Sequence, residues 1–188
     1  LLRAMLAQSA TDLAYACLQE TAKQVDAAVR QELTALKQTV QASRYQQLET
    51  YLKTQQWKEA DQETYRLMIT TVGKEDGQWF DRADLENFPC EDLQTLDQLW
   101  VEYSNGKWGF SVQKRIWQEF GSPMDYSEGW EQFGDRVGWR KDGDWLSTDD
   151  LTYDLKKSLK GRFPLCLVFG GLWGYYVYVF SSLAKRLV

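Results

Sequence analysis

With 188 residues, the chain can form one domain, or a domain with an appended segment, and can bury a hydrophobic core. It has nine Trp and ten Tyr but no His, which argues against haem ligation by His and against Ser-His or Cys-His nucleophiles. The net charge of −5, without a block of Lys and Arg, argues against nucleic-acid binding. The dispersed Cys17, Cys90 and Cys166 fit reduced thiols rather than a structural zinc site, and the start without Met fits a processed or excised piece.

The N-terminal segment, residues 1–44, predicts an extended helix or a helical pair. Residues 2–45 contain no Pro and no Gly, and their apolar positions recur every eleven residues. Such a repeat corresponds to about 3.67 residues per turn, so the apolar stripe stays on one side of a nearly straight helix. The segment either docks on its own domain or mediates self-association, and the pattern fits both. The stripe comprises Ala14, Leu18, Ala22, Val25, Val29, Leu33, Leu36 and Val40.

Residues 45–188 have the pattern of a compact helical domain. The apolar spacing of Trp57–Gly73 predicts a helix that ends at Gly73. Pro89 is suited to a first helical turn, and Asn105-Gly106 is suited to the end of the helix that follows. Strands are hardly indicated anywhere, so we predict the all-α class.

The stretch SNGKWGFSVQ, residues 104–113, raises the question of a catalytic, binding or structural role. Trp108 and Phe110 flank Gly109, so both rings can turn inward while the chain reverses. Ser111 can cap the next helix. Because no acid, nucleophile or cation is concentrated here, we interpret the stretch as a structural joint.

A long aromatic loop, about residues 138–164, follows the last of these helices. Loops of this length in a compact domain are usually functional or disordered, and four large aromatics argue against disorder. Its acidic residues could hold magnesium or act as acid and base. Interleaved lysines and the lack of a nearby nucleophile favour a solvated loop instead. The acidic residues are Asp142, Asp144, Asp149, Asp150 and Asp154.

The uncharged run Phe163–Ala184 has the length of a membrane helix, which needs about 20 apolar residues. Pro164 and three glycines interrupt it, and Gly170-Gly171 favours a turn in the middle. We therefore expect a buried loop and a terminal helix, with membrane contact at most peripheral.

The segment Phe88–Trp117, FPCEDLQTLDQLWVEYSNGKWGFSVQKRIW, resembles the signature of the genomes-uncoupled-four family. The resemblance covers residues 45–188 and continues in Trp57–Met68, Gly138–Trp145, Leu151–Leu155 and Gly161–Pro164. These proteins are non-enzymatic, porphyrin-binding regulators of magnesium chelatase in chlorophyll biosynthesis. The resemblance implies binding of protoporphyrin or magnesium-protoporphyrin, or of a bilin, and stimulation of the chelatase through its porphyrin-binding subunit. It also implies a location in the cyanobacterial cytoplasm or the chloroplast stroma.

The resemblance places the pigment on apolar walls rimmed by cations. The sequence departs from the family at Arg162, where a His is common, and at Arg82, where an apolar residue is usual. A tetrapyrrole offers a broad apolar face and two carboxylates, which independently favours aromatic residues next to Arg. Without His, a central metal would have no side-chain imidazole ligand, so metal-free or magnesium pigments fit better than haem. The expected ligand-binding residues are Arg66, Trp79, Phe80, Arg82, Leu85, Trp139, Arg140, Trp145, Leu151, Tyr153, Arg162 and Phe163.

Two other interpretations stay open. The fold can be retained as a protein-interaction module, with pigment binding altered by Arg82 and Arg162 and with assembly through residues 1–44. For each aromatic residue, ordinary core packing is the alternative to ligand contact.

Overall fold

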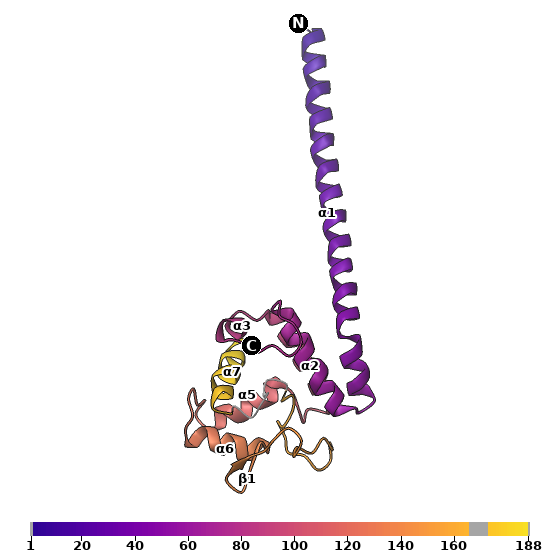
Figure 1. The fold of residues 1–188 in the computed structure, drawn as a ribbon. Helices are drawn as coiled ribbons and strands as arrows, with labels where there is room; N and C mark the ends of the chain where they lie inside the picture. Colours follow the sequence, from indigo (N-terminus) through magenta and orange to yellow (C-terminus); the bar gives the residue numbers. More distant parts are fainter. Residues whose placement is uncertain (1, 166–172, 188) are drawn as a thin grey trace. The chain divides into compact units, whose positions relative to one another are not determined.

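The structure is a computed structural model that describes residues 2–165 and 173–187, and the chain divides into two compact units, residues 1–46 and 47–188. Helix α1 (Leu2–Lys53) contributes to both units and is continuous, so the expected N-terminal element is one helix and not a pair (Figure 1). Within the first unit, every side chain from residue 23 to residue 36 is exposed. The apolar stripe of this stretch therefore faces solvent.

The second unit confirms the predicted all-α class. The helix expected from Trp57 ends at Thr71, and Gly73 follows with a φ of 75°. Pro89 is the residue before the next long helix, whose first turn carries Glu91 and Asp92. These acids lie at the positive end of the helix dipole. The helices after α1 are α2 (Trp57–Thr71), α3 (Arg82–Glu86), α4 (Cys90–Tyr103), α5 (Phe110–Glu119), α6 (Glu128–Val137) and α7 (Trp173–Arg186).

The late loop contains a short hairpin that the sequence analysis did not predict. Strands β1 (Arg140–Lys141) and β2 (Asp144–Trp145) pair antiparallel, with Arg140 opposite Trp145. Between them, Asp142 and Gly143 adopt φ values of 54° and 94°. Asp-Gly with positive φ at both central positions is the usual signal of a two-residue hairpin turn. Asp142-Gly143 in the sequence therefore already indicated this hairpin.

Residues 104–113 form the predicted structural joint. Asn105 and Gly106 have φ values of 53° and 75°. Trp108 and Phe110 are fully buried. The chain thus reverses at the surface while both rings turn into the core.

The cap expected from Ser111 is wrong. Gly109 precedes α5 and supplies no side-chain cap. Instead, the Ser111 amide donates to Asp97 Oδ1 of α4 at 2.8 Å, so a carboxylate from a neighbouring helix satisfies this amide. Burial raises the pKa of Asp97 above its ordinary 3.8, despite the hydrogen bonds from Ser111 and the charge of Arg115, which lower it.

Two aromatic clusters fill the core. The first places Phe163 from the late loop against Trp100 and Trp108, with ring centroids 6.3 and 5.0 Å apart. Trp100 Nε1 also donates to Thr64 Oγ1 of α2 at 2.9 Å. The second cluster joins α6, the hairpin and α7 through Trp130, Phe133, Trp139, Tyr176 and Phe180.

Helix α7 packs against α3 and α5 (Figure 1). Its side chains Tyr176, Val177 and Phe180 are buried, as expected for a terminal core helix. Among residues 2–165 and 173–187, no helix combines the length and the apolar character that crossing a membrane requires. The turn expected at Gly170-Gly171 lies outside the described residues.

Candidate functional site

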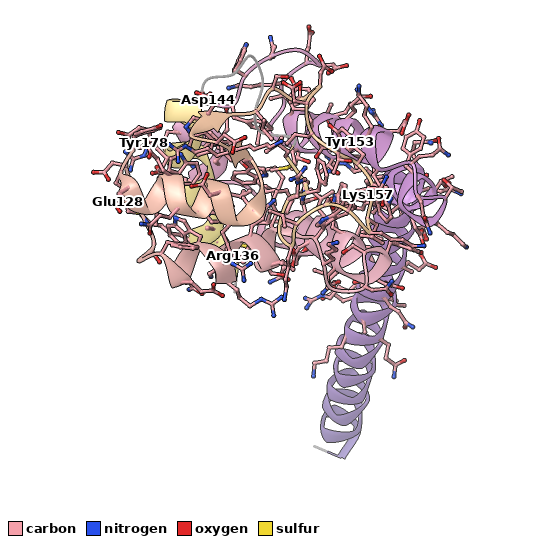
Figure 2. The ribbon with its side chains drawn as sticks, turned by 90° about the horizontal axis from the view of Figure 1, so that it is seen from below. Glu128, Arg136, Asp144, Tyr153, Lys157 and Tyr178 are labelled. Atoms are coloured by element: carbon pink, nitrogen blue, oxygen red, sulfur yellow. The ribbon has the colours of Figure 1, made fainter. Side chains whose placement is uncertain are left out.

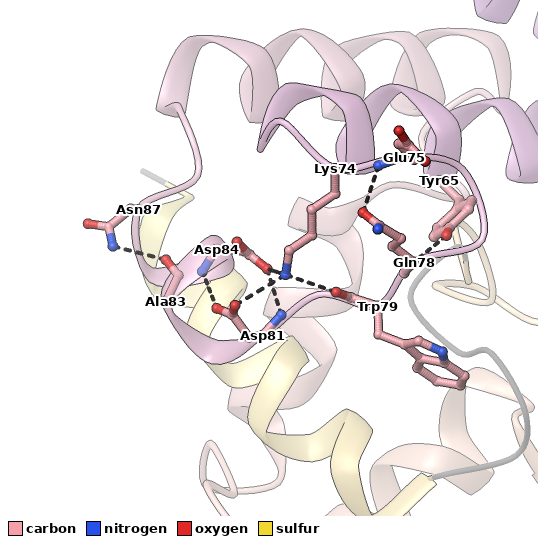
Figure 3. A network of polar contacts seen from close by, with 9 residues as sticks. All are labelled: Tyr65, Lys74, Glu75, Gln78, Trp79, Asp81, Ala83, Asp84 and Asn87. Atoms are coloured by element: carbon pink, nitrogen blue, oxygen red, sulfur yellow. Dashed lines mark hydrogen bonds and ion pairs between the residues drawn. The ribbon is translucent and has the colours of Figure 1, made fainter.

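The loop between α2 and α3 is held by a polar network around Lys74 (Figure 3). Lys74 Nζ contacts Asp84 Oδ2, lies 3.1 Å from Asp81 Oδ2 and donates to the Trp79 carbonyl at 3.0 Å. Asp81 and Asp84 also form a reciprocal capping box at the start of α3. Hydrogen bonding to Asp84 raises the pKa of Lys74. Tyr65 adds a second anchor, because its hydroxyl donates to the Gln78 carbonyl at 2.6 Å.

This loop presents Trp79 to solvent. The Trp79 side chain is 49% exposed and points away from the Lys74 network (Figure 3). Its neighbour Phe80 is buried, with its ring edge-on to Tyr65 at 6.1 Å. The hydrogen bonds of the loop therefore fix the backbone position from which the exposed Trp79 side chain extends.

Arg82 and Leu85 have different environments on α3. Arg82 is exposed and its Nε donates to Glu86 Oε1 at 2.6 Å, one turn along the same helix. Leu85 is fully buried. Leu85 thus packs in the core, and the Arg82 guanidinium already has a carboxylate partner.

The segment 151–165 brings Tyr153 onto Phe163, with ring centroids 4.6 Å apart and planes 20° from parallel. The Tyr153 side chain is partly exposed, whereas Leu151, at the start of the segment, is buried. Leu165 donates its amide to Asp61 Oδ1 at 2.6 Å, which fixes the end of the segment to α2. Burial raises the pKa of the Tyr153 hydroxyl above its ordinary value.

Arg162 is the most unusual of the expected site residues. Only 9% of it is exposed, and its side chain makes no hydrogen bond or ion pair with any residue that the structure describes. Its guanidinium lies over Gly138 at the end of α6, where an added Cβ would come within 2.2 Å of Nη2. Burial lowers the pKa of Arg162. A buried cation without a carboxylate partner costs free energy, so the position favours an anion.

The hairpin carries Trp139, Arg140 and Trp145. Trp139 is fully buried, and its Nε1 donates to the Arg162 carbonyl at 2.7 Å. Arg140 pairs with Glu131 at 3.0 Å and with Asp135 at 3.2 Å, so its charge is neutralised by α6. Trp145 is partly exposed and stacks on Trp130 with centroids 5.9 Å apart.

Arg66 lies on the exposed side of α2 and is bound by Glu63 one turn earlier, with Nε 2.7 Å from Oε2. This hydrogen bond raises the pKa of Arg66. Its charge is therefore already matched locally.

The structure thus distributes the expected residues over four parts of the fold, namely α2, the α2–α3 loop with α3, the hairpin and the 151–165 segment. Tyr153 contacts Phe163, and Trp139 contacts Arg162, whereas Trp79 lies on the separate α2–α3 loop. Figure 2 also shows Asp144, next to Trp145, well separated from Tyr153. Trp139, Phe163 and Leu85 are fully buried, so they belong to the core and expose no surface to a ligand. The partly or largely exposed aromatics are Trp79, Trp145 and Tyr153.

Sequence reasoning missed Lys74 and Tyr65, which position the Trp79 loop. Their local signals were weak, because a single Tyr within a helix or a single Lys shortly after one is common. The acidic residues of the late loop are exposed or half-exposed. No group of three or more acidic or thiol side chains within the described ranges could hold a metal ion.

Comparison with known proteins adds the family. The profile of the GUN4-like family matches residues 38–180. Ycf53 of Porphyra purpurea is 33% identical over 133 residues, covering 65% of this chain and 50% of that protein. The chloroplastic tetrapyrrole-binding protein of Arabidopsis thaliana is 32% identical over 112 residues, covering 58% of this chain and 38% of that protein. The chain thus spans about half or less of the length of these relatives.

Solved structures give the same fold. GUN4 from Chlamydomonas reinhardtii superimposes with a TM-score of 0.58 at 28% identity, covering 75% of this chain and 87% of that one. The ligand-free GUN4 of Arabidopsis thaliana gives a TM-score of 0.60 at 24% identity, covering 76% and 91%. With the family profile spanning residues 38–180, these matches identify the chain as a member of the GUN4-like family.

Proposed function

We propose that this chain binds a tetrapyrrole without transforming it. The observation that carries the proposal is the buried Arg162, whose guanidinium has no anionic partner within the described residues. A propionate of a porphyrin or bilin supplies the missing charge and two hydrogen-bond acceptors. The name of the Arabidopsis relative, a tetrapyrrole-binding protein, supports the same ligand class.

Exposed and half-exposed aromatics suit the apolar face of the ligand. The largely exposed Trp79 and the partly exposed Tyr153 would lie against the macrocycle, with Phe163 supporting Tyr153 from the core. Among the remaining predicted residues, the partly exposed Trp145 belongs to the wall in this proposal, whereas the buried Phe80, Leu85, Trp139 and Leu151 support it from the core. Arg66, Arg82 and Arg140 are already paired with carboxylates, so they belong to the rim only as paired charges. The chain offers no imidazole to a central magnesium, because it contains no His.

Replacement of Arg162 by Met separates binding from stability. Removing a buried, unpaired charge is expected to leave the free energy of unfolding unchanged or raised. Loss of a charge-assisted hydrogen bond should weaken protoporphyrin binding about 10- to 150-fold, for a loss of about 1.5–3 kcal/mol. Arg136→Met, on the exposed side of α6, is the matched control and should bind like the wild type.

The measurement is a titration with protoporphyrin, magnesium-protoporphyrin and a bilin, followed by the Soret band and by Trp fluorescence. The wild type should shift the band and quench the fluorescence at micromolar pigment. Unaltered spectra with all three pigments, or an Arg162→Met variant that binds as tightly as the wild type, would refute the proposal.

At the level of the pathway, we propose that the pigment-loaded chain stimulates magnesium chelatase through the porphyrin-binding subunit, in chlorophyll biosynthesis. The proposed location is the cytoplasm of a cyanobacterium or the stroma of a chloroplast. Relatives in Synechocystis and in Arabidopsis chloroplasts support these two settings. Adding the chain to a chelatase assay should raise its rate only when the Arg162 side chain is intact.

A second function, self-association through α1, is favoured by the exposed apolar stripe. Val25, Val29, Leu33 and Leu36 are 57%, 57%, 51% and 60% exposed. Their spacing of four, four and three residues keeps them on one face, and large exposed apolar stripes mark interaction sites. Leu33→Glu should lower the molar mass measured by light scattering, whereas Ala27→Glu, on the opposite face, should not. A monomeric wild type at high concentration would end this proposal.

A further inference from the structure

A pocket of about 440 Å³ lies between the start of α4 and the last turns of α7. Its volume is in the range of small-molecule sites. None of the residues proposed for the tetrapyrrole lines it, so it is a separate feature of the fold. The lining residues are Glu86, Cys90, Ser182, Lys185 and Arg186.

The Arg186 guanidinium lies next to the sulfur of Cys90. Its Nε donates to the Phe88 carbonyl at 2.6 Å, its Nη1 to the Glu86 carbonyl, and its Nη2 lies 3.3 Å from Cys90 Sγ. Two backbone contacts therefore hold the guanidinium in place beside the thiol. Cys90 is also a free cysteine at the first position of α4. Helix N-termini and adjacent Arg side chains are the settings in which cysteines act as nucleophiles.

Ser182 points independently to an occupant of the pocket. It is only 8% exposed, and its hydroxyl makes no hydrogen bond within the described part of the chain, yet it lines the pocket. The adjacent Ser181 satisfies its own hydroxyl by donating to the Tyr178 carbonyl at 3.1 Å. The Ser182 hydroxyl is therefore available to a ligand in the pocket that carries hydrogen-bonding groups.

The charge of the pocket selects an anionic occupant. Lys185 is exposed and has no ion-pair partner among the residues that the structure places. The Glu86 carboxylate is already bound by Arg82 at 2.6 Å. Lys185 and Arg186 therefore leave a net positive rim around Cys90.

We propose that Cys90 is a modification site that forms a mixed disulfide with a small thiol carrying carboxylates. Cys90 gives its proton to water, and its thiolate attacks one sulfur of the oxidised disulfide form of that thiol. The new bond joins Cys90 Sγ to that sulfur, the old sulfur–sulfur bond breaks, and the departing thiolate takes up a proton. The disulfide is the oxidant, so no other co-reactant is needed. Carboxylates of the bound half meet Lys185 and Arg186, and the Ser182 hydroxyl gains a partner.

The test uses the whole chain with two disulfide probes of opposite charge. Oxidised glutathione carries carboxylates, whereas cystamine carries ammonium groups on the same disulfide chemistry. Peptide mass mapping gives the rate of adduct formation at Cys90 for each probe. The wild type should react faster with glutathione disulfide, and Cys90→Ser should lack the adduct at this position.

Lys185→Gln and Ser182→Ala test the pocket itself. Lys185→Gln should slow the glutathione reaction about two- to fivefold, the effect of one exposed ion pair, without slowing the cystamine reaction. Ser182→Ala should slow the glutathione reaction by a similar factor, since one neutral hydrogen bond is lost. Lys156→Gln, on the exposed part of the 151–165 segment, is the matched control and should change neither rate. The proposal fails if folded Cys90 forms no adduct, if both probes react equally fast, or if Lys185→Gln has no effect.

Discussion

Replacing Gly109 by Ala tests the close approach of α4 to the start of α5. Gly109 has a φ of 139° and a ψ of 157°, a region that is essentially restricted to glycine. An added Cβ would lie 2.6 Å from Val101 Cγ2 and 2.8 Å from Asp97 Oδ1. Its amide also donates to the Phe163 carbonyl at 2.9 Å, so backbone movement would disturb the late segment.

Two costs add at this position. The unfavourable backbone conformation costs about 1–3 kcal/mol, and overpacking against α4 costs about 1–3 kcal/mol more. A central value of about 4 kcal/mol is a large share of the 5–15 kcal/mol that stabilises a typical domain. The corresponding fall in the melting temperature is about 8–16 °C.

Gly143→Ala separates the two costs. Gly143 has a φ of 94° in the hairpin turn, but nothing lies within 4 Å of an added Cβ. This control should lose only about 1–2 kcal/mol from backbone strain. Urea unfolding followed by Trp fluorescence is the assay, because every Trp lies in the 47–188 unit. Equal losses for the two variants would show that the contact with Val101 and Asp97 is not what requires glycine at 109.

Three further changes test individual polar groups. Because burial raises the pKa of Asp97 above 3.8, the folded chain binds this proton more tightly than the unfolded chain. The free energy of unfolding of the wild type, measured relative to Asp97→Asn, should therefore fall as the pH rises from 3.8 through the raised pKa. Urea titrations at several pH values measure this difference, and a rise with pH would contradict the assignment. Trp100→Phe removes the hydrogen bond to Thr64 and should cost about 1–3 kcal/mol in urea unfolding, so an unchanged midpoint would be inconsistent with that contact. Lys74→Met should speed amide hydrogen exchange in residues 78–81 without a change in α4, and unchanged exchange would show that the ion network does not hold this loop.

Local signals in the sequence were sufficient for most of the helices. The apolar spacing of Trp57–Thr71 indicates a helix from neighbouring residues alone. Asn105 and Gly106 likewise indicate the turn at their own positions, where both have positive φ. The burial of Trp108 and Phe110 was also predictable locally, because a turn between two helices can bury large rings only on the side that faces the core. Asp142-Gly143 was an equally local signal that the sequence analysis passed over.

Contacts between distant segments could not be read in this way. The capping of Ser111 by Asp97 depends on how α4 crosses α5, since either residue alone fits several local arrangements. The sequence identified Trp79, Tyr153 and Arg162 as candidates from residue type alone. The tertiary structure determined that Trp79 stays exposed, that Tyr153 stacks on Phe163, and that the Arg162 charge is buried.

The sequence by itself therefore determined most of the helices, though not α3 and α6, together with the abundance of aromatic residues and the family resemblance. These features depend on short-range spacing and residue type. Only the tertiary structure decided which aromatics are sealed in the core and which cations are already paired. Burial and charge pairing depend on residues up to about a hundred positions away, as in the contact of Leu165 with Asp61 and that of Arg186 with Phe88. No local pattern encodes those separations, because they are set by how whole helices pack.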